Sequence, residues 1–130
     1  MVIDPSAVLA ILQNEPERAA FNAAIAAAYE RRLSAASLVE LSIVVVARFG
    51  IEGQSDLDLF LSTANVAIVP FNADQAQIAR SAFHRFGKGR HPAGLNLGDC
   101  YSYALAQFCA APLLFKGNDF GLTDVEAAIA

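Results

Sequence analysis

The chain of 130 residues has no tryptophan, two cysteines and one methionine, and charged residues make up only 17% of it. Disorder is excluded for most of the chain, because disordered segments are polar and charged, whereas 55% of these residues are apolar. A net charge of −4 argues against a protein that coats nucleic acid, since such proteins are basic. The length fits one domain over residues 1–130 and leaves no room for two of ordinary size.

The sequence predicts neither an export signal nor a membrane span. Residues 1–4 lack the basic start of a signal peptide. The longest uncharged stretch, residues 100–115, contains Pro112 and is too short to cross a bilayer. Cys100 and Cys109 lie in one predicted helix, whose rise places their Cα atoms roughly 13 Å apart, beyond the ~7 Å limit for a disulfide. Two free thiols suit a reducing compartment, so we expect a cytoplasmic protein.

Short apolar runs alternate with helical patterns along the chain. The runs predict strands at residues 1–4, 33–36, 66–70 and 113–115, and the tail has room for one more. Helices are predicted at residues 5–12, 17–31, 37–49, 55–64, 72–86 and 96–109. Because short strands separated by helices pair in parallel through crossover connections, the sequence predicts a three-layer α/β fold with a parallel sheet.

Residues 37–49 carry two conflicting signals. Residues 43–46 are four β-branched residues in a row, which favours a strand. Ser37 followed by Glu40 is a helix-start signature and Gly50 suits the position after a helix, so we interpret the segment as a helix. It is apolar almost all round, which predicts burial on two sides. One side would face the core and the other a second subunit, as in a homodimer.

Four acidic residues follow the predicted strands. Asp4 ends the first strand, Asp119 follows the last, and Glu40 and Asp99 lie in the first turn of helices that leave the same edge of the sheet. Ligands bind at the carboxyl ends of the strands in such folds, so the four acids are expected in one pocket. Carboxylates packed together repel unless a cation holds them, and oxygen ligands favour Mg²⁺ or Mn²⁺. Two such ions can stabilise both the attacking and the leaving oxygen when a phosphodiester bond is cleaved.

Helix capping is the alternative interpretation of these acids. Residues 37–40 and 96–99 match or approach a capping box, in which an acid binds backbone N–H groups. Residues 55–58 show the same pattern and have no assigned function, so the pattern alone proves little. Asp4 would be an ordinary N-cap for the helix at residues 5–12. Both interpretations stay open at this point.

One segment collects the basic residues. Residues 75–98 contain no acid, and Arg85, Lys88 and Arg90 lie at its centre, close in sequence to Asp99. This placement predicts that the three side chains contact the phosphates of an anionic substrate, at the border of the acidic pocket. A solvated helix end and loop is the alternative.

Four motifs, in order along the whole chain, resemble the PIN-domain ribonucleases, and most closely the VapC toxins of bacterial type II toxin–antitoxin pairs. The loop at residues 87–96 resembles one VapC subgroup. The motifs are Val2-Ile3-Asp4-x-Ser6-Ala7, Ser37-x-x-Glu40, Leu97-Gly98-Asp99-Cys100 and residues 113–120.

The resemblance implies an α/β/α fold, a homodimer and Mg²⁺- or Mn²⁺-dependent cleavage of RNA. It makes Asp4, Glu40, Asp99 and Asp119 the catalytic acids, with Asp4, Asp99 and Asp119 as metal ligands and Glu40 acting directly or through water. It assigns the phosphate contacts of the basic loop to RNA. It also implies a cognate VapB-type antitoxin, whose C-terminal segment wraps the toxin and blocks the pocket.

Two residues depart from the family pattern. Pro5 replaces the usual Thr or Ser, so the nearby hydroxyl would come from Ser6, and Asn118 replaces an acid that some relatives carry. The alternative function is therefore a catalytically weak PIN domain that binds RNA or protein. Aspartyl-phosphate chemistry at Asp4 is a third option. Proteins with that chemistry usually carry a second acid two residues later, where this chain has Ser6, and this argues against the option.

Overall fold

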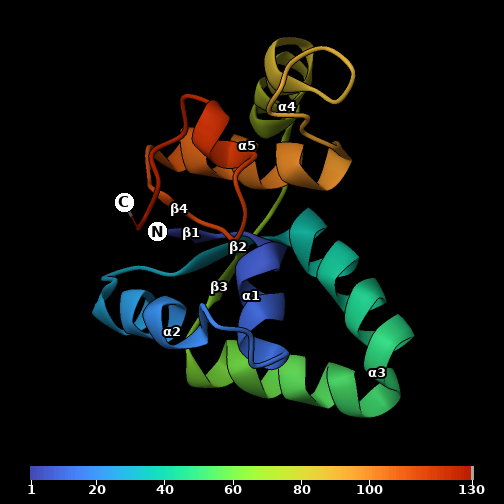
Figure 1. The fold of residues 1–130 in the computed structure, drawn as a ribbon, viewed down its shortest axis with the longest axis vertical. Helices are drawn as coiled ribbons and strands as arrows, with labels where there is room; N and C mark the ends of the chain where they lie inside the picture. The colour runs from blue at the N-terminus through green and yellow to red at the C-terminus, as the bar shows by residue number, and fades with distance from the viewer. Residues whose placement is uncertain (130) are drawn as a thin grey trace.

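The computed structural model describes residues 1–129 (Figure 1). Strands and helices alternate along the chain, as the apolar runs predict. Their bounds are β1 (Val2–Ile3), α1 (Pro5–Leu12), α2 (Arg18–Ala27), β2 (Arg32–Ser34), α3 (Ala35–Thr63), β3 (Ala67–Val69), α4 (Ala73–Phe86), α5 (Leu97–Cys109), β4 (Leu113–Leu114) and the short 3-10 helix η1 (Phe120–Leu122).

The strands form one parallel sheet in the order β3-β2-β1-β4. Val2 in β1 pairs with Arg32 in β2 and with Leu113 in β4, so β1 lies in the middle of the sheet. Parallel pairing brings the carboxyl ends of all the strands to one edge. The tail adds an isolated parallel bridge between Leu113 and Ala127 at the other side of β4, where one more short strand was expected.

Helices cover both faces of the sheet, which gives three layers (Figure 1). Neighbouring residues of a strand point to opposite faces. Val2 and Leu113 therefore pack with α4 and α5, while Ile3 and Leu114 pack with α1, α2 and α3. The predicted three-layer α/β fold is confirmed. The chain has, over residues 1–129, no helix that is both long and apolar enough to cross a membrane.

The second helix is shorter than predicted. Residues 17–31 were expected to be helical, but α2 ends at Ala27, because Ala28 adopts an extended conformation. Arg31 lies beyond the end of α2, but its side chain still binds the last turn of the helix. Its guanidinium donates hydrogen bonds to the carbonyls of Ile25 (2.6 Å) and Ala26 (3.3 Å), which belong to the last turn of the helix.

The third helix begins earlier than predicted and bends. Ser34 is its N-cap and accepts a hydrogen bond from the backbone N–H of Ala36 (3.2 Å), so the predicted capping box at Ser37 and Glu40 is wrong. The helices expected at residues 37–49 and 55–64 are joined at Gly50, whose φ of 67° and ψ of −153° interrupt the helix. Figure 1 shows the resulting bend in α3.

One face of α3 is open to solvent. Leu41 and Val45 are fully buried against the core, as expected. The opposite side is not covered by the chain itself: it exposes Val39 (59%), Ile43 (64%) and Phe49 (48%). Burial of one side of this helix against the core is confirmed, and burial of the other side against a second subunit stays a prediction. Cys100 and Cys109 are free thiols in α5, as predicted.

The bend at Gly50 generates a prediction. Substitution Gly50→Ala should lower the free energy of unfolding by about 1–3 kcal/mol, because its φ and ψ belong to a region that only glycine occupies readily. A Cβ at this position would meet nothing within 4 Å, so the cost would come from the backbone alone. Urea denaturation measures it. Gly121→Ala is the matched control, since it has equal space and no positive φ, and an equal loss there would contradict the explanation.

Candidate active site

Asp4 lies at the carboxyl end of β1 and is 4% exposed. It is the N-cap of α1 and accepts a hydrogen bond at Oδ2 from the backbone N–H of Ser6 (2.9 Å). Its other oxygen, Oδ1, accepts one from the hydroxyl of Ser102 (2.5 Å). Burial raises the pKa of Asp4, and the hydrogen bonds from Ser102 and Ser6 lower it in part. Asp4 is thus a cap, and also a carboxylate buried at the end of the central strand.

Ser102 is a contributor to the site that sequence reasoning missed. It is fully buried in α5, and its Oγ also lies 3.5 Å from Oγ of Ser37 in α3. Its position three residues after Asp99 places the two on neighbouring helical positions. This spacing from Asp99 was the signal available in the sequence for Ser102, and it does not indicate the contact with Asp4.

Glu40 occupies the second turn of α3, not the first, and its carboxylate rests directly on Gly98 of α5. A Cβ built on Gly98 would lie 1.9 Å from Oε2 of Glu40, so only glycine permits this approach. Burial raises the pKa of Glu40, and the carboxylates of Asp4 and Asp99 raise it further. Glu40 is therefore not a capping residue, and it feels the charges of two of the other predicted acids.

Asp99 forms the capping box that the sequence suggested. Its Oδ2 accepts a hydrogen bond from the backbone N–H of Asn96 (3.0 Å), and its own N–H donates to Oδ1 of Asn96 (2.9 Å). Burial raises the pKa of Asp99 to about 6. The hydrogen bond from Asn96 opposes this shift, and the charges of Asp4 and Asp119 support it. The same side chain both caps α5 and belongs to the acidic group.

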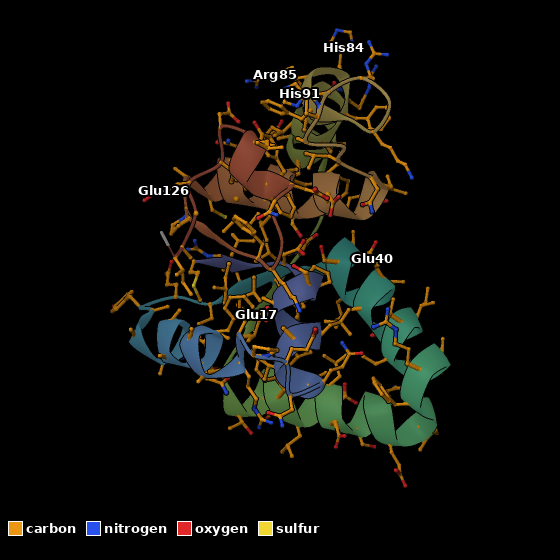
Figure 2. The ribbon with its side chains drawn as sticks, viewed as in Figure 1. Glu17, Glu40, His84, Arg85, His91 and Glu126 are labelled. Carbon is orange, nitrogen blue, oxygen red and sulfur yellow. The ribbon has the colours of Figure 1, made fainter. Side chains whose placement is uncertain are left out.

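Asp119 lies on an exposed loop, which contacts of Lys116 attach to the rest of the fold. It precedes η1 and makes no side-chain capping hydrogen bond there. The loop is attached at Lys116, whose backbone N–H donates to Oγ of Ser6 (3.0 Å). The ammonium of Lys116 also forms ion pairs with Glu15 and, at 3.2 Å, with Glu17, which Figure 2 labels beside α1. Ser6 thus links this loop to the first turn of α1.

The structure brings the four predicted acids to one edge of the sheet, where they influence one another electrostatically. Within residues 1–129, no three acid, histidine or cysteine side chains are arranged closely enough to hold one ion as they stand. The chemistry of the group still suits a hard divalent cation. Its donors are all carboxylate oxygens, and their mutual repulsion raises pKa values that a cation would lower.

The predicted phosphate contacts lie apart from these acids. Figure 2 shows Arg85 at the far end of α4, well away from Glu40. Arg85 forms an ion pair with Asp124 (2.9 Å), which also accepts a hydrogen bond from the hydroxyl of Tyr103 (2.5 Å). The guanidinium of Arg90 donates to the carbonyl of His84 (3.2 Å). Lys88 is exposed. Arg85 therefore already has a carboxylate partner, and the phosphate contacts of all three remain predictions.

Fold and site together agree with a class of α/β protein that places acids at the carboxyl edge of a short parallel sheet. Residues 1–126 match the family described as the PIN domain, and the chain belongs to that family. Within it, the chain belongs to the VapC group. It is 54% identical over 127 residues to Ribonuclease VapC of Mycolicibacterium smegmatis, with 98% of each chain covered. It is 52% identical over 125 residues to Ribonuclease VapC30 of Mycobacterium tuberculosis, covering 96% of this chain and 95% of the relative.

Solved structures show the same fold. The crystal structure of VapBC2 from Rickettsia felis, bound to a DNA fragment from its promoter, matches with a TM-score of 0.73. The alignment covers 97% of this chain and 95% of that one at 20% identity. The family resemblance and the fold class that the motifs predicted are confirmed.

The contact between Glu40 and Gly98 generates a second prediction. Gly98→Ala should lower the free energy of unfolding by about 1–3 kcal/mol, because the new methyl group overlaps the Glu40 carboxylate. In a Glu40→Ala background the same change should be neutral or stabilising, since alanine is the better helix former. Urea denaturation of the four chains in this double-mutant cycle measures the coupling. An equal loss in both backgrounds would show that Glu40 does not rest on Gly98.

Proposed function

We propose that this protein is the toxin of a type II toxin–antitoxin pair and that it cleaves RNA phosphodiester bonds with the help of Mg²⁺ or Mn²⁺. The observation that supports the proposal most is electrostatic: Glu40 feels the charges of Asp4 and Asp99, and Asp99 feels those of Asp4 and Asp119. The printed names of the relatives, Ribonuclease VapC and Ribonuclease VapC30, support the reaction and the substrate.

Each carboxylate has a separate role in this proposal. Asp4, Asp99 and Asp119 are the ligands for the ion, and Glu40 acts directly or through a water molecule. A bound ion would supply Lewis-acid stabilisation of the charge that develops on the phosphodiester oxygens. Asp4 and Asp99 keep lone pairs for this role while they cap their helices, because each carboxylate oxygen accepts more than one bond. Ser102 and Ser6 fix the orientation of the Asp4 carboxylate.

Partners and location follow the same reasoning. Arg85, Lys88 and Arg90 are proposed to contact RNA phosphates, with Arg85 exchanging Asp124 for the substrate. A VapB-type antitoxin is the proposed protein partner, as the VapBC2 complex of Rickettsia felis suggests. The exposed apolar face of α3 is proposed to meet a second copy of the chain in a homodimer. We place the protein in the cytoplasm, in keeping with its free thiols.

A binding module without catalysis is the second candidate. Two observations favour it: no three of the acids within residues 1–129 are arranged to hold an ion as they stand, and Asp99 is engaged in a cap. Under this alternative the acids would stabilise helix ends, and the chain would bind RNA or protein without cutting it.

Cleavage by an Asp99→Asn variant distinguishes the two candidates. We expect it to reduce RNA cleavage by at least about 100-fold, since it removes a ligand charge. The free energy of unfolding should change by less than about 1 kcal/mol, because asparagine still accepts the hydrogen bond of the cap. The assay follows a single-stranded RNA with added Mn²⁺ and with EDTA, which should stop the wild type. Asp58→Asn, an exposed acid in α3, is the control. Full cleavage by Asp99→Asn would remove Asp99 from the site.

The homodimer has its own test on α3. Val46 is 42% exposed, whereas its neighbour Val45 is fully buried. Val46→Glu should give monomers that remain folded, because the charge opposes packing against a second apolar face. Val45→Glu should instead destabilise the fold by more than about 3 kcal/mol, since it buries an unpaired charge. Sedimentation velocity at micromolar concentration measures the first effect. A wild type that sediments as a monomer would contradict the dimer.

A further inference from the structure

A pocket of about 450 Å³ opens between α4 and α5, outside the acidic site. Its volume falls within the ~300–1,000 Å³ range of small-molecule sites. Three aromatic rings and an arginine line it, together with smaller apolar groups. The lining residues that matter here are Phe71, Arg80, Phe83, Leu97 and Tyr101.

The fold places this pocket at the same edge of the sheet as the acids. Phe71 lies two residues beyond the carboxyl end of β3, and Tyr101 lies two residues after Asp99 on α5. The rings of Phe71 and Tyr101 meet edge to face, with centroids 5.1 Å apart and planes at 74°. Two residues turn a helix by about 200°, so the pocket and Asp99 lie on opposite sides of the first turns of α5. An extended ligand that crosses the N-terminal end of α5 can therefore reach both the pocket and Asp99.

The mouth of the pocket is apolar and open. Leu97 is 68% exposed and Phe83 is 42% exposed, although both are large apolar residues. Isolated exposed side chains of this kind need no explanation, but here they border one hollow that aromatic rings also line. The pocket therefore offers flat apolar faces to a flat apolar ligand.

The charge within the lining of the pocket has one sign. Arg80 is the charged residue among the described residues that line it, and the whole segment 75–98 contains no acid. Its Nη1 donates to Oε1 of Gln77 (3.1 Å), which leaves further N–H groups of the guanidinium for an anion. The pocket thus combines aromatic faces with a cation at its rim. A nucleotide has the complementary parts, a planar base and a phosphate.

We propose that this pocket binds one unpaired base of the RNA, beside the nucleotide whose phosphate lies at the acids. The inference rests on the proposed function. Single-stranded RNA binds proteins by stacking its bases on aromatic rings and arginine, while cationic groups follow the backbone. The Phe83 and Tyr101 rings supply stacking surfaces, and the Arg80 guanidinium contacts the adjoining phosphate.

The lining also sets the kind of selectivity. Apart from Arg80, its polar groups are the hydroxyl of Tyr101 and the thiol of Cys100, too few to read the edge of a particular base. Stacking tolerates every base, because each has a π face. The pocket therefore selects an unpaired nucleotide over a paired one, and leaves the choice of sequence to other contacts.

The test uses the full chain and a short single-stranded RNA that carries 2-aminopurine at one position. Ca²⁺ replaces Mn²⁺ to prevent cutting, and the chain contributes no tryptophan fluorescence to the background. Stacking in the pocket should quench 2-aminopurine at one position along the RNA. Phe83→Ala should weaken binding roughly tenfold and restore the fluorescence. Phe108→Ala is the control, because Phe108 is also a half-exposed aromatic residue (44%), on α5, and does not line the pocket.

An abasic RNA completes the experiment. Removing the base at the quenched position should weaken binding to the wild type about as much as Phe83→Ala does, and the variant should then lose nothing more. Equal losses on intact and abasic RNA, or no loss on either, would overturn the base pocket. A Phe83→Ala chain that becomes monomeric while the wild type is dimeric would also overturn it, since the pocket would then be a contact between copies.

A parallel cleavage assay of the wild type in Mn²⁺ separates this inference from the proposed function. Cleavage without the Phe83 effects overturns the pocket alone. The Phe83 effects without cleavage overturn the nuclease and leave the base pocket standing. Equal melting temperatures of wild type, Phe83→Ala and Phe108→Ala, measured by circular dichroism, exclude unfolding as the cause of a loss; a lower value for Phe83→Ala alone would overturn the inference.

Discussion

The buried carboxylate of Asp4 is the constraint around which the rest of the structure is arranged. It ends the central strand of the sheet, whose residues Val2 and Ile3 are almost fully buried in the two cores. Taking a charge out of water costs several kcal/mol unless polar partners replace the water. The N–H of Ser6 and the hydroxyl of Ser102 are those partners. Because one comes from α1 and the other from α5, the same carboxylate links the layers on both faces of the sheet.

Helix α5 is the element that turns separate acids into a group. Gly98 gives the Glu40 carboxylate room to approach, Asp99 caps the helix, and Ser102 reaches Asp4 one turn later. A larger side chain at position 98 would push α3 away, and an apolar one at position 102 would leave an oxygen of Asp4 without its partner. Small and polar residues in this turn are thus explained by what lies against them and not by helix propensity. The other side of the same turn carries the apolar mouth of the pocket at Leu97 and Tyr101.

Sequence reasoning succeeded where a signal was local. Acids at the ends of apolar runs predicted the group at the sheet edge, and the spacing of Asn96 and Asp99 predicted a cap that the structure contains. It failed at the start of α3, because Ser34 and Ser37 are both serines before an apolar stretch, and only the pairing of β2 with β3 decides between them. Sequence reasoning also predicted too long a helix for α2. Alanine gives no signal for a helix end, and the last turn is instead bound by the side chain of Arg31, which follows it in the chain.

Contacts between distant parts of the chain had no sequence signal. The hydrogen bond from Ser102 to Asp4 joins residues 98 positions apart, and the one from Arg85 to Asp124 joins residues 39 apart. Composition and spacing predicted that the guanidinium of Arg85 would be free and close to the acids. In the structure it pairs with the carboxylate of Asp124, away from them. Only the three-dimensional arrangement could show that Asp124 pairs with this side chain.

The ion pairs around the C-terminal segment act on position more than on stability. Lys116 holds one end of the loop that carries Asp119, through Glu15 and Glu17, and Asp124 holds the other end through Arg85. The Arg85–Asp124 pair is about half exposed, and solvent screens such pairs so that they add little to stability. Fixing both ends of a short loop nevertheless restricts where Asp119 can stand relative to Asp99. Ser6 adds a hydrogen bond from the Lys116 backbone, so its hydroxyl attaches this loop to α1 although Pro5 beside it has none.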